Sequence, residues 1–321
     1  MIRKPHALLA TLACLVVGTA AAQDFPSRPI TIVIPYPAGG TSDGQVRMIQ
    51  EKLSKLLGKP VVVENKAGAS GAIAAQYVAQ SKPDGHTLLY PNTGFLITPL
   101  LNDKAGYDPL KDFKPITQTT SVPMVLLASK DVPGKSLSEF LQYARKQPKG
   151  IMYASAGTTS FGHIESARFG QMAGIKAEAV PYRGEANTTM ALRAGDVQML
   201  LTSPSAAMLG QVQQGNIKLL GVGTTKPSPL LPGTPTIANT IPGFTSNIWF
   251  GLLAPAGTPD NAVGKIQAAV KTIMEGEDIR AQLAPTGALP QTSTPAEFAK
   301  LMKDESAQLR ENITKFNIKA E

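Results

Sequence analysis

The sequence predicts an α/β fold in two lobes, each built as a doubly wound sheet flanked by helices. Short apolar strands alternate along the chain with amphipathic helices, which is the pattern of βα units. Two of these units, at residues 35–43 and 155–163, share a turn rich in glycine and hydroxyl residues between strand and helix. Two further segments, near residues 123 and 245, are expected to carry the chain into the second lobe and back.

The first lobe opens on a continuous apolar run, which is typical of a strand buried on both faces of a parallel sheet. Apolar residues then recur at helical spacing, and Gly58 stands where a helix C-terminal cap is expected. A second glycine-rich turn at residues 65–71 leads into another helix. The predicted elements are a strand at 30–34, a helix to 57, a strand at 61–63, a helix to about Gln80 and a strand at 86–90.

The second lobe begins with an apolar segment at residues 122–127, and a strand at 247–253 returns the chain to the first lobe. The remainder is mainly helical, and Thr294 and Glu297 have the spacing of a capping box. The predicted lobes are residues 23–123, 124–245 and, after the return, 246–321. Between the two passages we expect helices at 137–145 and 161–172 and strands at 151–154, 197–201 and 218–222.

Residues 1–22 have the features of a secretory signal peptide. Arg3 and Lys4 precede an uncharged apolar stretch that ends in small residues before Gln23. Cys14 is the one cysteine, and residues 15–17 continue the apolar stretch beyond it, whereas a cysteine destined for lipid attachment should close it. We expect export to the periplasm with cleavage after about Ala22, which leaves a mature chain without disulfides or thiolate metal sites.

The charged residues indicate a soluble chain without a nucleic-acid surface. Lys and Arg number 31 against 23 Asp and Glu, and the basic residues are scattered, not grouped in a run. His86 and His163 are the histidines beyond the leader and lack metal-ligand spacing, so no metal site is expected. The turn at 65–71 lacks the lysine of a phosphate-binding loop, so no nucleotide cofactor is expected either.

The turn at residues 35–43 has the composition of an anion-binding helix start. Gly39 and Gly40 permit close backbone approach, and Thr41, Ser42 and Asp43 are residue types that cap helices. A carboxylate at a helix N-terminus is held by unpaired N–H groups without any basic side chain. The alternative is an ordinary capped turn, in which Asp43 caps the helix or pairs with Arg47.

The turn at residues 155–163 is likewise rich in glycine and hydroxyl residues before a predicted helix. It also allows a second interpretation, as part of a hydrolase site. Ser160 lies in a pattern close to the nucleophile elbow of a serine hydrolase, but His163 is only three residues away and no histidine follows it. His163 is either hydrogen-bonded at the helix start or a ligand donor. Aromatic residues near the predicted loops either wall a pocket or belong to the core: Tyr36, Phe95, Phe161 and Tyr182. For Trp249, core packing is the expected role.

Several motifs together resemble the Bug receptors, the periplasmic solute-binding proteins of tripartite tricarboxylate transporters. The likeness spans nearly the whole mature chain, and the order of the motifs is more specific than any one of them. They are Pro-Ser-Arg-Pro-Ile at 26–30, Gly-Gly-Thr-Ser-Asp at 39–43, Val-Glu-Asn-Lys-Ala-Gly-Ala at 63–69, Pro-Asp-Gly-His-Thr-Leu at 83–88, Val-Pro-Tyr-Arg-Gly at 180–184 and Leu-Ala-Pro-Ala-Gly-Thr-Pro at 253–259.

The resemblance implies a Venus flytrap that closes on a small organic acid, has no cofactor or catalytic residue, and delivers its ligand as a monomer to a membrane permease. An alternative role is to present the ligand to a membrane sensor kinase. The ligand contacts that we expect are Tyr36, Ala38, Gly39, Gly40, Thr41, Ser42 and Asp43 from one lobe, and Ser155, Ala156, Gly157, Thr158, Thr159, Ser160, Phe161, His163, Pro181, Tyr182, Gly184, Thr202 and Ser203 from the other.

Three positions depart from the family's usual pattern and bear on the ligand. Thr159 and Phe161 replace a glycine and a proline, which should make the pocket narrower and more apolar. Residues 202–204 are neutral, where relatives often carry an acidic residue that would face a ligand ammonium. We therefore expect a carboxylic acid without an amino group, such as a dicarboxylate or an aromatic acid.

Overall fold

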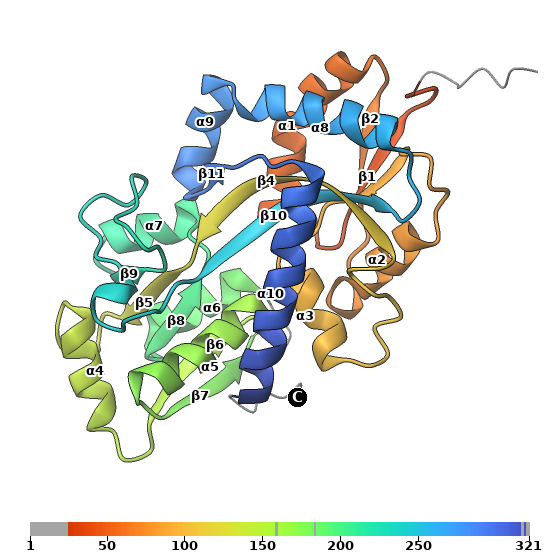
Figure 1. The fold of residues 1–321 in the computed structure, drawn as a ribbon. Coiled ribbons are helices and arrows are strands. Elements are labelled where there is room, and N and C mark those ends of the chain that lie inside the picture. Colours follow the sequence, from red (N-terminus) through yellow and green to blue (C-terminus); the bar gives the residue numbers. More distant parts are fainter. Residues whose placement is uncertain (1–24, 158–159, 183, 316–317, 319–321) are drawn as a thin grey trace, which may run out of the picture.

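The computed structural model describes residues 25–157, 160–182, 184–315 and 318. The predicted leader with Cys14, and Thr158 and Thr159 of the predicted ligand contacts, lie outside these residues. The described chain forms two lobes, each with its own sheet, and the long strands β4 and β10 extend from the upper lobe toward the lower one in Figure 1.

The first lobe is built on a six-stranded sheet in the order β11-β4-β10-β3-β1-β2 among the described residues. Strand β1 pairs in parallel with β2 and β3, as expected for a fully buried apolar strand. The antiparallel pairing of β10 with β3 and β4 makes the sheet mixed. Its strands are β1 (Ile30–Ile34), β2 (Val61–Asn65), β3 (Thr87–Leu89), β4 (Phe113–Pro123), β10 (Asn247–Pro255) and β11 (Leu289–Pro290).

Helices cover this sheet and extend to the C-terminal end of the described chain. Helix α1 ends at Gly58, whose left-handed φ of 68° closes the helix as the sequence predicts. The helices are α1 (Thr41–Leu57), α2 (Ala72–Ala79), α3 (Gly94–Leu101), α8 (Asp260–Met274), α9 (Glu277–Leu283) and α10 (Pro295–Lys315), with short 3₁₀ turns η1 (Ala69–Gly71) and η3 (Ala284–Thr286).

The second lobe holds a five-stranded sheet in the order β7-β6-β8-β5-β9 within the described residues. Strand β6 pairs in parallel with β7 and β8, whereas β5 is antiparallel to β8 and β9. The elements are β5 (Val125–Ser129), α4 (Leu137–Arg145), β6 (Ile151–Ser155), α5 (Phe161–Ala173), β7 (Ala177–Pro181), α6 (Glu185–Ala194), β8 (Met199–Thr202), α7 (Ala206–Gln213), β9 (Ile217–Val222) and η2 (Ile237–Asn239).

The segments that connect the sheets are hydrogen-bonded to one another. The N–H of Met124 donates to the carbonyl of Ser246 at 3.0 Å, and the Met124 carbonyl accepts from the N–H of Gly223 at 2.8 Å. A Cβ atom on Gly223 would lie 2.5 Å from the Ser246 oxygen, so this close approach requires glycine. We call Met124, Gly223 and Ser246 the lobe junction.

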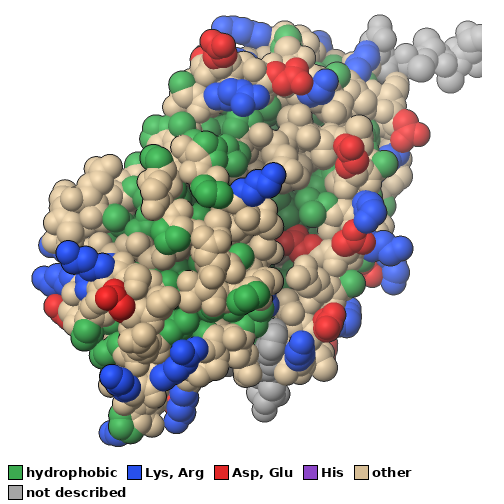
Figure 2. Space-filling view, turned by 60° about the vertical axis from the view of Figure 1, so that its left-hand side comes forward, with side chains coloured by type: hydrophobic (Ala, Val, Ile, Leu, Met, Phe, Trp, Pro, Cys, Tyr) green, Lys and Arg blue, Asp and Glu red, His purple; other side chains and the backbone are tan. Residues whose placement is uncertain are grey.

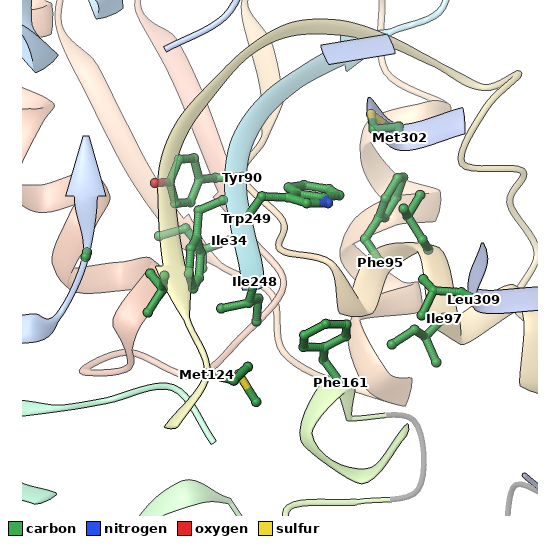
Figure 3. Packing of buried hydrophobic residues seen from close by; sticks show 14 of the residues in the cluster. Ile34, Tyr90, Phe95, Ile97, Met124, Phe161, Ile248, Trp249, Met302 and Leu309 are labelled. Carbon is green, nitrogen blue, oxygen red and sulfur yellow. The ribbon is translucent and has the colours of Figure 1, made fainter. Parts of the chain in front are cut away.

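A single apolar cluster runs through the lobe junction. Figure 3 shows Ile34, Met124, Phe161 and Ile248 around it, and all four are at most 8% exposed. Helix α10 packs on β4 and α3 and also contacts α5, so it connects the two lobes on one side (Figure 1).

The α/β two-lobed prediction is confirmed, although each sheet mixes parallel and antiparallel strands. None of the helices in the described residues has the length and apolar character to cross a membrane. Figure 2 shows acidic and basic side chains interspersed on one face of the molecule, without a patch of one sign.

Candidate functional site

The start of α1 supplies unpaired backbone donors at the carboxyl end of β1. Gly40 is the N-cap in an extended conformation, and no side chain caps the helix there. Within the described residues, the N–H groups of Thr41, Ser42 and Asp43 have no hydrogen-bond acceptor. Because these donors point out of a helix N-terminus, they form a site suited to an anion. We call residues 38–43 the first cradle.

Asp43 shapes the first cradle with its carboxylate. One oxygen accepts from the N–H of Gly39 at 3.0 Å, and the carboxylate is also paired with the Nε of Arg47 at 2.9 Å. These contacts lower the pKa of Asp43, and the hydrogen bond from Arg47 contributes most. The pairing with Arg47 that the sequence predicts is confirmed, and it directs the Asp43 carboxylate to protein groups.

The start of α5 supplies a second set of backbone donors at the carboxyl end of β6. Ser160 is the N-cap, and its Oγ accepts from the N–H of His163 at 3.2 Å. The N–H groups of Phe161 and Gly162 have no acceptor among the described residues. Ser155 fixes the preceding turn because its hydroxyl bonds both the N–H and the carbonyl of Gly157. We call residues 155–163 the second cradle and make no structural statement about Thr158 and Thr159.

The neighbouring strands of the second lobe bring more predicted residues to this edge. Ser155 is in register with Pro181, and the N–H of Tyr182 donates to the Ser155 carbonyl at 2.7 Å. Thr202 ends β8, which is parallel to β6, so Thr202 and Ser203 reach the same edge of the sheet. Ala156, Gly157, Gly184 and Ala38 lie in the turns at the ends of their strands.

The aromatic residues divide between the site and the core. The hydroxyl of Tyr36, a half-buried residue, donates to Asn92 Oδ1 at 2.6 Å and thereby fixes the side chain beside the first cradle. Phe161 is 7% exposed and packs into the apolar cluster of Figure 3, and it also lines the polar cavity described below. Tyr182 packs against the smaller apolar cluster of the second lobe, and Phe95 and Trp249 are core residues as well.

The arrangement of Ser160 and the histidines does not match that of a serine hydrolase. The Ser160 hydroxyl caps α5, and the imidazole of His163 has its Nδ1 3.2 Å from the Tyr153 hydroxyl. His86 lies in the first lobe, where its Nε2 accepts from the N–H of Ser27 and its Nδ1 faces Asp84. In the described part of the chain, no three His, Cys, Asp or Glu side chains are grouped as metal ligands.

Glu185 lies next to the predicted contacts at 181–184, and the sequence analysis did not select it. It is the first residue of α6 and follows Gly184, whose left-handed φ of 85° turns the chain into the helix. Burial raises the pKa of Glu185, and hydrogen bonding to the Ser203 side chain partly offsets that rise.

A polar cavity of about 490 Å³ lies beside the lobe junction, between α5, α10 and the connecting segments. Phe161 is the one predicted ligand contact among the described residues that line it. Glu165 and Arg168 form a buried ion pair there, and Arg168 also donates to the carbonyl of Thr245. Opposite them, the carboxylate of Glu305 accepts from the indole N–H of Trp249.

Comparisons with known proteins agree with the two-lobed fold. The model of the tripartite tricarboxylate transporter family receptor matches residues 45–318. The structure of R. palustris Rpa4515 with adipate is 32% identical with a TM-score of 0.84, over 93% of this chain and 100% of that one. MatC (Rpa3494) from Rhodopseudomonas palustris with bound malate is 33% identical, with a TM-score of 0.78 over 90% and 100% of the chains. The periplasmic binding protein BugD is 30% identical, with a TM-score of 0.80 over 92% and 100% of the chains.

The matched region begins just after the first cradle and covers the second cradle, and the neighbours share the two-lobed fold. The motifs at 63–69, 83–88, 180–184 and 253–259 lie inside it. The chain therefore belongs to the tripartite tricarboxylate transporter receptor family, whose members include the Bug periplasmic solute-binding proteins.

Proposed function

We propose that this protein captures a small organic carboxylate between its lobes and delivers it to a membrane permease of the tripartite tricarboxylate type. The observation that carries the proposal is the pair of helix starts, α1 and α5, whose N–H groups lack partners and which approach the lobe junction from different lobes. A ligand that contacts both cradles binds the closed arrangement better than the open one, and this difference drives closure.

Two structural neighbours are solved with adipate and malate, which are both dicarboxylates. A dicarboxylate fits the two cradles of this chain, because one carboxylate would meet each helix start. An aromatic acid is the other class that we propose to test. The binding itself requires no chemical step, and the Ser160 hydroxyl serves as a helix cap.

A thermal-shift screen of organic acids tests the proposal and identifies the ligand. An acid present at about 100 times its dissociation constant should stabilise the protein by about 2.7 kcal/mol, which shifts the unfolding temperature by several degrees. If no organic acid stabilises the protein, capture of a carboxylate is wrong. Loss of uptake of the identified acid on deletion of the gene would then support delivery to a permease.

A bulky residue at Gly40 should abolish binding of that acid without unfolding the protein. Gly40 has a φ of −80°, which any residue adopts, and a Cβ there would meet its first neighbour only at 3.5 Å. We expect Gly40→Leu to lose at least about a hundredfold in affinity by calorimetry, because the side chain would cover the donors of the first cradle. Gly157 is a poorer position for this test, because its φ of 129° strains any other residue.

Gly264→Leu is the matched control for Gly40→Leu. Gly264 lies on the exposed face of α8 with no atom within 4 Å of an added Cβ. Its variant should bind like the wild type, and circular dichroism should show both variants folded. Unchanged affinity in a folded Gly40→Leu protein would refute the first cradle as the ligand site.

We also propose that the mature protein acts in the periplasm after cleavage of the leader at about Ala22. The family membership supports this location. Mass spectrometry of the protein from a periplasmic extract should give an N-terminus near Gln23, and a lipid-modified N-terminus at Cys14 would contradict it.

A further inference from the structure

The polar cavity beside the lobe junction is separate from the donors of both cradles. Its volume of about 490 Å³ falls in the range of about 300–1,000 Å³ that small-molecule sites have. Its walls come from both lobes, because α5 belongs to the second lobe and α10 packs on β4 and α3 of the first. Within the described part of the chain, Phe161 is the one residue of either cradle that lines it. A molecule other than the ligand of the cradles can therefore occupy this cavity.

The buried part of the cavity wall holds polar groups with unused hydrogen-bonding capacity. Gln118 is 5% exposed, and its Nε2 donates to the carbonyl of Thr120 at 3.2 Å, while its Oε1 accepts no hydrogen bond within the described residues. Glu305 is half-buried, and one of its two carboxylate oxygens accepts the indole N–H of Trp249. Because Gln118 and Glu305 both line the cavity, each can offer an oxygen to a bound molecule.

The charged side chains that line the cavity compensate one another. Arg168 donates from Nε and Nη2 to the two carboxylate oxygens of Glu165, at 3.0 and 2.5 Å, and the two side chains are 7% and 4% exposed. Burial raises the pKa of Glu305 to about 8, so this third group is mainly protonated at neutral pH. No other charged side chain of the described residues lines the cavity, which therefore presents no net charge.

Uncharged amide and hydroxyl groups form the remaining polar wall. An amide side chain carries both donors and an acceptor, and a hydroxyl group donates and accepts through one oxygen. Six of these side chains make no hydrogen bond within the described residues, namely Ser121, Thr225, Asn247, Gln291, Gln308 and Asn312. Leu301 and Trp249 add apolar surface. Such a wall matches a molecule that carries several hydroxyl groups on a carbon frame.

Ions match this cavity less well than neutral molecules do. An organic anion would meet the carboxylates of Glu165 and Glu305, while the guanidinium of Arg168 is already paired with Glu165. An organic cation would have to compete with Arg168 for Glu165 or to ionise Glu305 inside the protein. A neutral polar molecule avoids both costs and needs only hydrogen bonds.

We propose that the polar cavity between α5 and α10 is a second binding site, which takes a neutral polyhydroxylated molecule such as a polyol or a monosaccharide. The proposal goes beyond carboxylate capture, because the two ligands differ in charge and occupy different sites. The hydroxyl groups of the molecule bond Gln118, Glu305 and the uncharged wall. Since this wall comes from both lobes, the bound molecule contacts both.

Calorimetry with glucose, glucuronate and glucosamine tests the proposal, because these three share a ring and differ in charge. Glycerol and myo-inositol extend the neutral set. We expect at least one neutral probe to bind with a dissociation constant of about 1 mM or tighter. Glucuronate and glucosamine should bind at least about tenfold more weakly than that probe. An organic acid that fills the cradles should not displace it.

Gln308→Trp should cover the cavity from α10 and weaken the neutral probe at least about tenfold. Gln308 is exposed and lines the cavity, so an indole there leaves the core intact. Ala307→Trp is the matched control, because Ala307 is exposed at the preceding position of α10 and does not line this cavity. It should bind the probe like the wild type.

Three results would overturn the second site: no binding of any neutral probe, tighter binding of a charged one, or equal binding by Gln308→Trp and the wild type. Displacement of the probe by the acid would also overturn it, because the probe would then occupy the cradles. The proposed function would stand in each case, since its own test is the binding of the acid.

Discussion

Glu305 is a half-buried acid whose surroundings favour its neutral form. It lies on α10 against the polar cavity, where the indole N–H of Trp249 donates to its carboxylate. Burial raises the pKa of Glu305 to about 8, the Trp249 hydrogen bond lowers it, and the charge of Glu165 across the cavity raises it. At neutral pH the folded protein therefore holds a proton that the unfolded chain releases.

This proton makes stability depend on pH. The pKa of Glu305 is higher in the folded than in the unfolded state, so the folded protein binds the proton more tightly. The free energy of unfolding therefore falls as the pH rises from about 4 to about 8. Glu305→Gln keeps an acceptor for Trp249 and cannot ionise. We expect it to be more stable than the wild type at pH 8 by about 2 kcal/mol and to lose that advantage near pH 5.

Chemical denaturation of both proteins from pH 5 to pH 9 measures this difference. Glu311→Gln provides the control, because Glu311 is exposed on the same helix. Its stability should follow the wild-type curve at every pH. Parallel curves for Glu305→Gln and the wild type would show that Glu305 ionises normally in the folded protein.

Among the elements, α5 both supports the second lobe and presents the second cradle. Its N-cap, Ser160, bonds the N–H of His163, and Gly162 lets the helix start approach β8, because a Cβ there would lie 2.7 Å from the Leu201 carbonyl. At its other side, Arg168 joins α5 to the segment that returns to the first lobe. The position of the cradle is therefore tied to the lobe junction.

Removal of the cap should affect stability and binding together. Ser160→Ala should cost about 1 kcal/mol of stability in chemical denaturation, a typical loss for an N-cap. It should also weaken ligand binding several-fold, because the first turn of α5, the proposed ligand contact, would fray.

Ser136→Ala separates the two effects. Ser136 caps α4 in a full capping box with Glu139, and α4 follows β5, which runs antiparallel to β8. This cap therefore lies at the opposite end of the lobe from the second cradle. Its variant should lose a similar stability and keep its affinity, and equal binding by both variants would remove α5 from the proposed site.

Local patterns account for the elements that the sequence predicted well. The helix at 137–145 has the bounds of α4, and the helix at 161–172 differs from α5 by one residue, since caps and apolar spacing are encoded nearby. Thr294 and Glu297 form the predicted capping box. The antiparallel place of β10 in the centre of the first sheet was not predicted, because it depends on pairing with β4 across more than a hundred intervening residues.

The same distinction applies to the site. Both cradles were predicted because each is a turn of consecutive residues with its own helix start. Glu305 was missed because its importance comes from Trp249, which is distant in sequence. For Phe161 the sequence left a pocket wall and the core as alternatives, and the packed structure shows it in the apolar cluster and also lining the cavity.

At the scale of the whole molecule, the lobe junction sets how closely the segments that connect the two lobes approach one another. Gly223 admits the Ser246 backbone at a distance that no side chain allows. Gly223→Ala should therefore separate the connecting segments and lower the free energy of unfolding by about 1–3 kcal/mol, as overpacking does. It should also weaken ligand binding, because closure depends on the same segments.

Denaturation and calorimetry of Gly223→Ala test this prediction. Gly210→Ala is the control, since Gly210 lies in α7 and an added Cβ would meet nothing within 4 Å. That variant should be as stable as the wild type or slightly more so. A Gly223→Ala protein with wild-type stability and affinity would show that the junction tolerates displacement.

Because β10 lies in the centre of the first sheet, it also determines the order in which the two lobes can complete their sheets. Strands β5 to β9 follow one another along the chain, whereas β3 and β4 await a partner that ends only at Pro255. As the polypeptide emerges from the ribosome, the second lobe has all its strands before the first can close its sheet. Such a delay would suit the proposed export of the chain through a membrane before it folds.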